Sequence, residues 1–152
     1  MPAQIIIQLA CKQKNIPSKI KMLRWVNTVA AKNKKISITV RLVKESEMRQ
    51  LNKLYRKKDK ITDILSFSSE LPKKMSGDFI GDIALCLKRI NADINKKNKV
   101  SDHHWAHLLI HGTLHLLGFD HETIQDADIM MAREIKCLNQ LGIPNPYEIN
   151  HE

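Results

Sequence analysis

The stretch HHWAHLLIHGTLHLLG, from His103 to Gly118, sets the expectation for the fold. Its residues from His103 to Leu117 predict a helix that is apolar on most of its sides. A helix of this kind packs against neighbours on several faces, so we expect it at the centre of the molecule. Gly118 is expected to end it, because glycine readily adopts the left-handed conformation that closes helices.

Strand and helix patterns alternate along the rest of the chain. Alternating apolar residues predict a half-buried strand at Ile36–Val43. Further strands are predicted at 5–9, 62–67 and 79–86. A helix is predicted from Pro17 and Ser18 to 32–35, with apolar positions at Ile20, Leu23, Val26 and Ala30. Further helices are predicted over 45–55, from 87 past 94, and over 127–141. Residues 70–77 are predicted to form a loop. We therefore expect one domain spanning 1–152, an α/β (or α+β) sandwich in which a mixed sheet of about four strands packs with helices around the histidine-bearing helix. The order of the strands does not follow from the sequence.

Length and composition limit the class of protein. The 152 residues, 43% of them apolar, suffice for one folded core. No apolar run is long enough to cross a bilayer, and residues 1–12 lack the pattern of a signal peptide, which predicts a cytoplasmic protein that does not enter a membrane. Three widely spaced cysteines indicate buried thiols rather than disulfides or a zinc ribbon.

The net charge of +9 allows two interpretations. A basic surface attracts phosphate polymers such as nucleic acid. Solvated, lysine-rich helix faces give the same charge without any such partner. Charge alone leaves both open.

Three histidines in HGTLHLLGFDH, residues 111–121, predict a metal site. His111 and His115 stand one helical turn apart, so both rings leave the same helix face. The glycine at 118 allows the chain to fold back and bring His121 to the same ion. A single histidine here would more often be a packed core residue, but three at this spacing favour metal binding. Three neutral imidazoles leave a fourth position for water, which is typical of a catalytic zinc site, and nickel or copper could also bind there.

Other polar residues near this segment receive weaker expectations. His107 lies one turn further upstream, too far for the same ion, and is interpreted as a support to the ligands or a core residue. His103 and His104 are expected at the surface. Asp120 and Asp82 could orient a ligand imidazole, although Asp120 is equally suited to capping the turn.

The spacing of the three histidines nearly matches that of the metzincin zinc peptidases. Those enzymes carry a glutamate after the first histidine, which acts as general base. Here that residue is Gly112, which disfavours peptide cleavage. Cleavage of a phosphodiester instead needs a cation that balances charge on the phosphoryl oxygens, and arginine is the preferred residue. The chain has six arginines, so a second clue is needed to choose among them.

That clue comes from a resemblance to the YbeY family of endoribonucleases, also called rRNA maturation factors. One motif is His111-Gly112-x-x-His115-Leu116-x-Gly118-x-Asp120-His121. The other is Leu51-Asn52-x-x-Tyr55-Arg56, followed by Thr62-Asp63-Ile64-Leu65-Ser66-Phe67, with a weaker echo in Gly81-Asp82-Ile83. Together these motifs span most of the chain from about residue 48 to 121.

The resemblance implies a cytoplasmic, metal-dependent bacterial enzyme that cuts single-stranded RNA. It implies roles in maturation of the 16S rRNA 3′ end and in ribosome quality control, with ribosomal RNA and the small subunit as partners. It also implies that His111, His115 and His121 bind one Zn²⁺ and that Arg56 holds the substrate phosphate. Without the resemblance, Arg56 would be interpreted as a solvated residue in the basic run 53–60.

Two departures from the family pattern and two rival functions remain. Phe119 replaces the usual tyrosine beside the metal turn, and Ser68 replaces a proline that often follows the Ser-Phe pair. One rival is a non-catalytic ribosome assembly factor whose metal is structural. The other is a metallohydrolase of peptides or small amides, which Gly112 disfavours.

Overall fold

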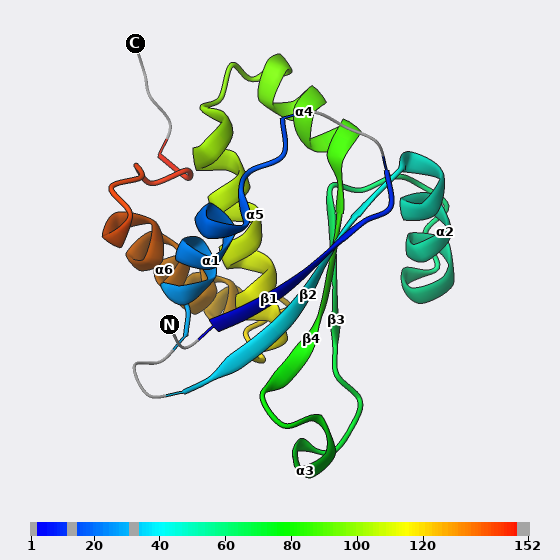
Figure 1. Ribbon diagram of the computed structural model, residues 1–152. Coiled ribbons are helices and arrows are strands. Elements are labelled where there is room, and N and C mark those ends of the chain that lie inside the picture. Colours follow the sequence, from blue (N-terminus) through cyan, green and yellow to red (C-terminus); the bar gives the residue numbers. More distant parts are fainter. Residues whose placement is uncertain (1–2, 12–14, 31–33, 149–152) are drawn as a thin grey trace.

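Four strands form one mixed sheet in the computed structural model, which describes residues 3–11, 15–30 and 34–148 (Figure 1). The strands are β1 (Ala3–Leu9), β2 (Ile36–Val43), β3 (Ile64–Ser68) and β4 (Phe79–Cys86). Their order across the sheet is β1-β2-β4-β3. β1 and β4 each pair with β2 in parallel, whereas β3 runs antiparallel to β4 and leaves its other edge free. The prediction of a mixed sheet of about four strands is confirmed.

Helices cover both faces of this sheet (Figure 1). They are α1 (Lys19–Asn27), α2 (Glu45–Arg56), α3 (Lys73–Ser76), α4 (Leu87–Lys96), α5 (Ser101–Leu116) and α6 (Ile124–Gln140). α1 and α5 pack on one face, α6 packs against α5, and α2 lies on the opposite face. Because side chains alternate along a strand, Ile83 and Leu85 join the core under α5, whereas Ala84 and Cys86 join a smaller core under α2.

α5 is the central helix that the sequence predicts. Trp105, Leu109 and Ile110 are fully buried, and most other residues of the helix are buried too. The helix lies close to the sheet at Gly112. A Cβ built there would lie 3.0 Å from Ile64 Cδ1 and 3.1 Å from Ile83 Cδ1. Glycine at this position therefore lets the end of α5 that carries the histidines lie directly on β3 and β4.

Three predicted elements differ from the structure in type or by more than two residues at one end. α1 ends at Asn27, before Ala30, because the Thr28 hydroxyl and amide both donate hydrogen bonds to Trp25 O. The helix was predicted to end at 32–35, and residues 32–33 of that range lie outside the described residues. Its buried residues are Met22, Trp25 and Val26, and the predicted core position Ile20 is exposed. The predicted loop at 70–77 contains the one-turn helix α3. α6 starts three residues early, since the Thr123 side chain caps it by accepting from Asp126 N.

The described chain is a single α/β domain, as predicted. That this domain takes in all of 1–152 stays a prediction. All three cysteines are unpaired as predicted, with Cys86 and Cys137 buried but Cys11 partly exposed. Among the described residues, no helix combines the length and apolarity that a bilayer crossing requires.

Candidate metal centre

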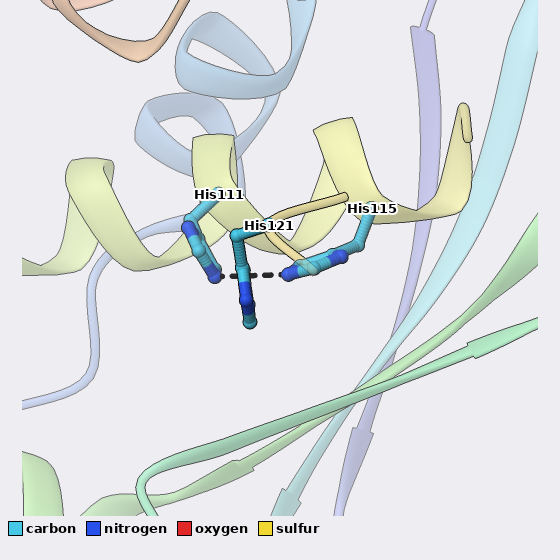
Figure 2. A group of neighbouring side chains, drawn as sticks. All are labelled: His111, His115 and His121. Carbon is cyan, nitrogen blue, oxygen red and sulfur yellow. Dashed lines mark hydrogen bonds between the residues drawn. The ribbon is translucent and has the colours of Figure 1, made fainter. Parts of the chain in front are cut away.

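The C-terminal end of α5 and the turn after it bring three imidazoles together (Figure 2). His111 and His115 project from successive turns, and their Nε2 atoms lie 3.1 Å apart. Gly118 then adopts a φ of 101°, a conformation that side chains other than glycine rarely take. The chain turns back there, and the ring centroid of His121 lies 4.9 Å from that of His115.

This donor set fits a metal ion. One ligand nitrogen from each histidine can be chosen so that all three lie within 4.8 Å of one another. Nitrogens at 2.0–2.1 Å from a tetrahedral zinc lie about 3.3 Å apart, close to the 3.1 Å between His111 and His115. Burial and the neighbouring imidazoles of His111 and His121 lower the pKa of His115. A neutral imidazole keeps the lone pair that a metal needs.

Glu134 orients His111 from the neighbouring helix. This residue of α6 is almost fully buried, and its Oε1 accepts a hydrogen bond from His111 Nδ1. A proton on Nδ1 leaves the lone pair on Nε2, which is the nitrogen that faces His115. Carboxylates that support ligand histidines in this way are common at metal sites.

Two further donors hold the Glu134 carboxylate. His107 Nε2 lies 3.0 Å from Glu134 Oε2, and the Tyr147 hydroxyl donates to the same oxygen. Burial alone would raise the pKa of Glu134, but the hydrogen bonds from His107, His111 and Tyr147 lower it to about 2. Conversely, burial and the neighbouring carboxylate raise the pKa of Tyr147. The Glu134 carboxylate is therefore ionised at physiological pH and accepts hydrogen bonds from three donors.

Glu134 was not predicted from the sequence, and the expectation that Asp82 could orient a ligand imidazole is wrong. The missed signal was a lone carboxylate on the buried face of α6, between Met130 and Cys137. Asp82 lies on the sheet face opposite α5, because its neighbours on β4, Gly81 and Ile83, face that helix. It therefore does not orient a ligand histidine.

The remaining expectations near the site have mixed outcomes. Asp120 caps the turn, since its Oδ1 accepts from His121 N at 2.6 Å. His107 supports the cluster through Glu134, in agreement with one of its two interpretations. His104, expected at the surface, is only 8% exposed. It lies one helical turn before Leu108, on a face of α5 that is buried.

Arg56 shares a cleft with the three histidines. The cleft has a volume of about 580 Å³ and is lined by Arg56, Ser66 and Ser68 opposite the imidazoles. Arg56 is the last residue of α2, and its Nη2 donates to Ser66 O at 3.1 Å on the free edge of β3. The structure thus brings all four residues predicted from the sequence into one half-open site.

The position that carries the metzincin glutamate does not face this cleft. Gly112 is buried, and a Cβ there would point at Ile64, Ile83 and the Ser66 hydroxyl on the sheet. A carboxylate at this position would meet β3 and β4 rather than a substrate. The fold is therefore incompatible with the metzincin arrangement of the general base, and the absence of glutamate follows from how α5 packs.

Many known proteins are similar to this chain over most of its length. The model of the family described as Endoribonuclease YbeY matches residues 7–142. Proteins named Endoribonuclease YbeY from Colwellia psychrerythraea and Buchnera aphidicola are 42% and 44% identical. The first alignment covers 94% of this chain and 96% of the relative, and the second covers 94% of each.

Two further matches agree with this result. The Endoribonuclease YbeY of Nitrosococcus oceani is 40% identical, over 97% of this chain and 99% of the relative. A solution structure of a Thermotoga maritima protein has a TM-score of 0.55 at 21% identity, covering 96% of this chain and all of that one. At this identity the structural match supports the fold alone.

Proposed function

The chain belongs to the Endoribonuclease YbeY family, and from this premise we propose that it is a zinc-dependent enzyme that cuts single-stranded RNA. His111, His115 and His121 hold one ion, and Arg56 binds the phosphate at the cut. The observation that carries this proposal is the convergence of the three imidazoles in the same cleft as Arg56. Metal ligands and a phosphate-binding cation are the two components that metal-assisted phosphodiester cleavage requires.

Zinc is the first choice of metal because of the donor set. In the part of the chain that the structure describes, three imidazoles make up the cluster, without a carboxylate or thiolate. Zinc commonly takes three histidines and leaves a fourth position for solvent in catalytic sites. Nickel and copper accept the same ligands, so metal analysis has to distinguish them. A bound ion supplies Lewis acidity for activating water or polarising the phosphodiester.

The protein side chains have separate tasks in this proposal. Glu134 holds the His111 ring so that its Nε2 points at the ion. The Gly118 turn brings His121 to the open side of the cleft, where its side chain is exposed. The Arg56 guanidinium, already fixed by Ser66 O, presents its remaining N–H groups to a phosphate. Donors arranged in advance stabilise developing negative charge without having to reorganise during the reaction.

The substrate proposed is ribosomal RNA, in particular the 3′ end of the 16S rRNA on the small subunit. A half-open cleft and a net charge of +9 suit a flexible, single-stranded polyanion. This role in maturation and quality control places the enzyme in the cytoplasm, where ribosomes assemble. Fractionation of cells should then find the protein with the small subunit and its precursors.

Cleavage of an end-labelled, single-stranded RNA by purified protein tests the proposal. Wild type is expected to cut the RNA, to lose activity with chelator and to regain it with zinc. His115→Ala is expected to lose both metal and cleavage, whereas Arg56→Ala should lose cleavage and keep its metal. Lys58→Ala, in the same exposed basic run, is the matched control for Arg56.

Two results would contradict this function. Full cleavage by completely metal-free protein would exclude the role of the ion. Binding of ribosomal RNA without cleavage by either wild type or Arg56→Ala would instead identify an assembly factor with a structural metal.

A further inference from the structure

A second groove lies beside the histidine cleft, on the other side of strand β3. It has a volume of about 700 Å³ and shares Arg56, Ser66 and Ser68 with the cleft. β3 is an edge strand, so its outer side pairs with no other strand of the described residues. Ser66 faces α5, since its hydroxyl donates to Gly112 O, whereas its neighbour Phe67 faces α2. A ligand can therefore pass from one site to the other by crossing the free edge of the sheet.

The groove presents an aromatic ring to solvent. Tyr55, on α2, is 59% exposed. Its ring meets that of Phe67 edge-on, with centroids 5.0 Å apart and planes at 62°. Phe67 is partly buried against the core under α2 and contacts the Tyr55 ring on the side of the sheet. A rigidly supported, exposed ring is the platform on which single-stranded nucleic acids stack their bases.

The charges in the groove favour a base over a phosphate. Arg41 is occupied by Glu47, which accepts from its Nε and Nη2 at 2.6 and 2.9 Å. The carboxylates of Asp82 and Glu70 also line the groove. Apart from the shared Arg56 at the rim, the groove thus holds more negative than positive charge, and a phosphate inside would be repelled. Polar side chains and an aromatic ring suit a neutral nucleobase.

We propose that this groove is a nucleobase subsite, in which a base adjoining the scissile phosphate stacks on Tyr55. The RNA strand crosses the edge of β3, with its phosphate at Arg56 on one side and its base between α2 and the sheet on the other. This inference rests on the proposed function, because it takes single-stranded RNA as the ligand. It assigns Tyr55 to substrate binding and separates that role from metal binding.

Abasic substitution combined with mutation tests the subsite. A series of labelled oligoribonucleotides shares one defined cut site, and each member lacks the base at a different position. KM and kcat are measured for each member. In wild type, removing the base that stacks on Tyr55 should raise KM about tenfold, which is within the range for stacking on an aromatic ring. Tyr55→Ala should raise KM about tenfold on the intact RNA and lose its sensitivity to that abasic position.

Two control variants accompany this measurement. Tyr55→Phe keeps the ring and should retain the abasic effect at the same position, which distinguishes stacking on the ring from a role of the hydroxyl. Leu54→Ala removes a side chain that is also exposed on α2 but does not line the groove, and should keep the full abasic effect. Zinc content should be the same in all four proteins.

Several outcomes would overturn the subsite. One is an increase in KM on base removal that persists in Tyr55→Ala, and another is the lack of any position at which base removal changes KM. A third is a change in the oligomeric mass of Tyr55→Ala with unchanged KM, which would identify a second copy of the chain as the occupant of the groove. Each of these leaves wild-type cleavage intact. Failure of wild type to cut any RNA would instead refute the proposed function, so the two failures are distinguishable.

Discussion

Replacing Glu134 by glutamine is expected to weaken zinc binding without unfolding the protein. Glu134 is the only carboxylate that contacts a ring nitrogen of the three histidines among the described residues. Glutamine has nearly the same shape but carries no charge. The variant therefore removes the electrostatic part of the support to His111 and leaves the packing between α5 and α6 largely in place.

The magnitude follows from the hydrogen bonds. The carboxylate accepts from His111, His107 and Tyr147, and glutamine has a single acceptor oxygen, so its NH₂ must face some of these donors. A hydrogen bond to a charged group contributes about 1.5–3 kcal/mol, against about 1 kcal/mol for a neutral one. Changes in residues that support metal ligands typically cost about 10- to 100-fold in affinity. We expect a loss of zinc affinity in this range for Glu134→Gln.

Competition with a chromophoric chelator measures the affinity, and urea unfolding of the chelated proteins measures stability. Tyr147→Phe is the matched control, because it removes one donor to the same carboxylate and leaves the Glu134 contact with His111 intact. Its zinc affinity should fall by less than that of Glu134→Gln, because His111 still donates to a charged carboxylate. Unaltered zinc affinity in Glu134→Gln, with the fold retained, would refute the assigned role.

Three further predictions follow from other parts of the structure. Arg56→Lys keeps the positive charge but loses the planar guanidinium that binds phosphate in two places, so kcat/KM for RNA should fall roughly 10- to 100-fold with unchanged zinc content. A variant that cuts RNA as fast as wild type would contradict this. Gly112→Ala places a Cβ 3.0 Å from Ile64 Cδ1. The resulting overpacking should outweigh the gain in helix propensity and lower the free energy of unfolding, measured by urea titration, by about 1 kcal/mol. A variant more stable than wild type would show that the neighbouring side chains move aside without cost. Burial, followed by nearby Lys99, lowers the pKa of His104 to about 4 from 6.5, so the unfolded state binds more protons between these pH values. His104 should therefore lower the stability of wild type by about 2 kcal/mol between pH 7 and pH 5, and His104→Gln should lack this contribution. Equal pH dependence in the two proteins would contradict the shift. The other titratable groups that face His104 are Asp63, Asp93 and His107.

The parts of the fold that sequence predicted are those with a strong local pattern. The strand at Ile36–Val43 was predicted with its observed bounds, because its apolar residues alternate. The central position of α5 followed from its apolar residues, which lie on most of its sides. The strand order β1-β2-β4-β3 could not be predicted, because it depends on contacts between distant segments that leave no periodic trace. The exposed Ile20 shows the same limit, since only the packing of α1 decides which of its apolar residues face the core.

The candidate site divides in the same way. The histidine spacing and the glycine turn are local, so His111, His115 and His121 could be chosen from the sequence alone. Arg56 is far from the histidine motif in the sequence, and only the family resemblance distinguished it from the other arginines. Glu134 comes from a helix that follows the histidine turn, and its role depends on how α6 packs against α5. A lone carboxylate on a buried helix face was the available signal.

Anomalous diffraction at the zinc edge from crystals of the zinc-loaded protein tests the central claim most directly. We expect one strong peak per chain, coordinated by His111, His115 and His121, with solvent as the remaining ligand and the Arg56 guanidinium across the same cleft. A peak at other residues, or a fourth protein ligand that closes the coordination sphere, would contradict the assignment of this cluster as a catalytic metal centre.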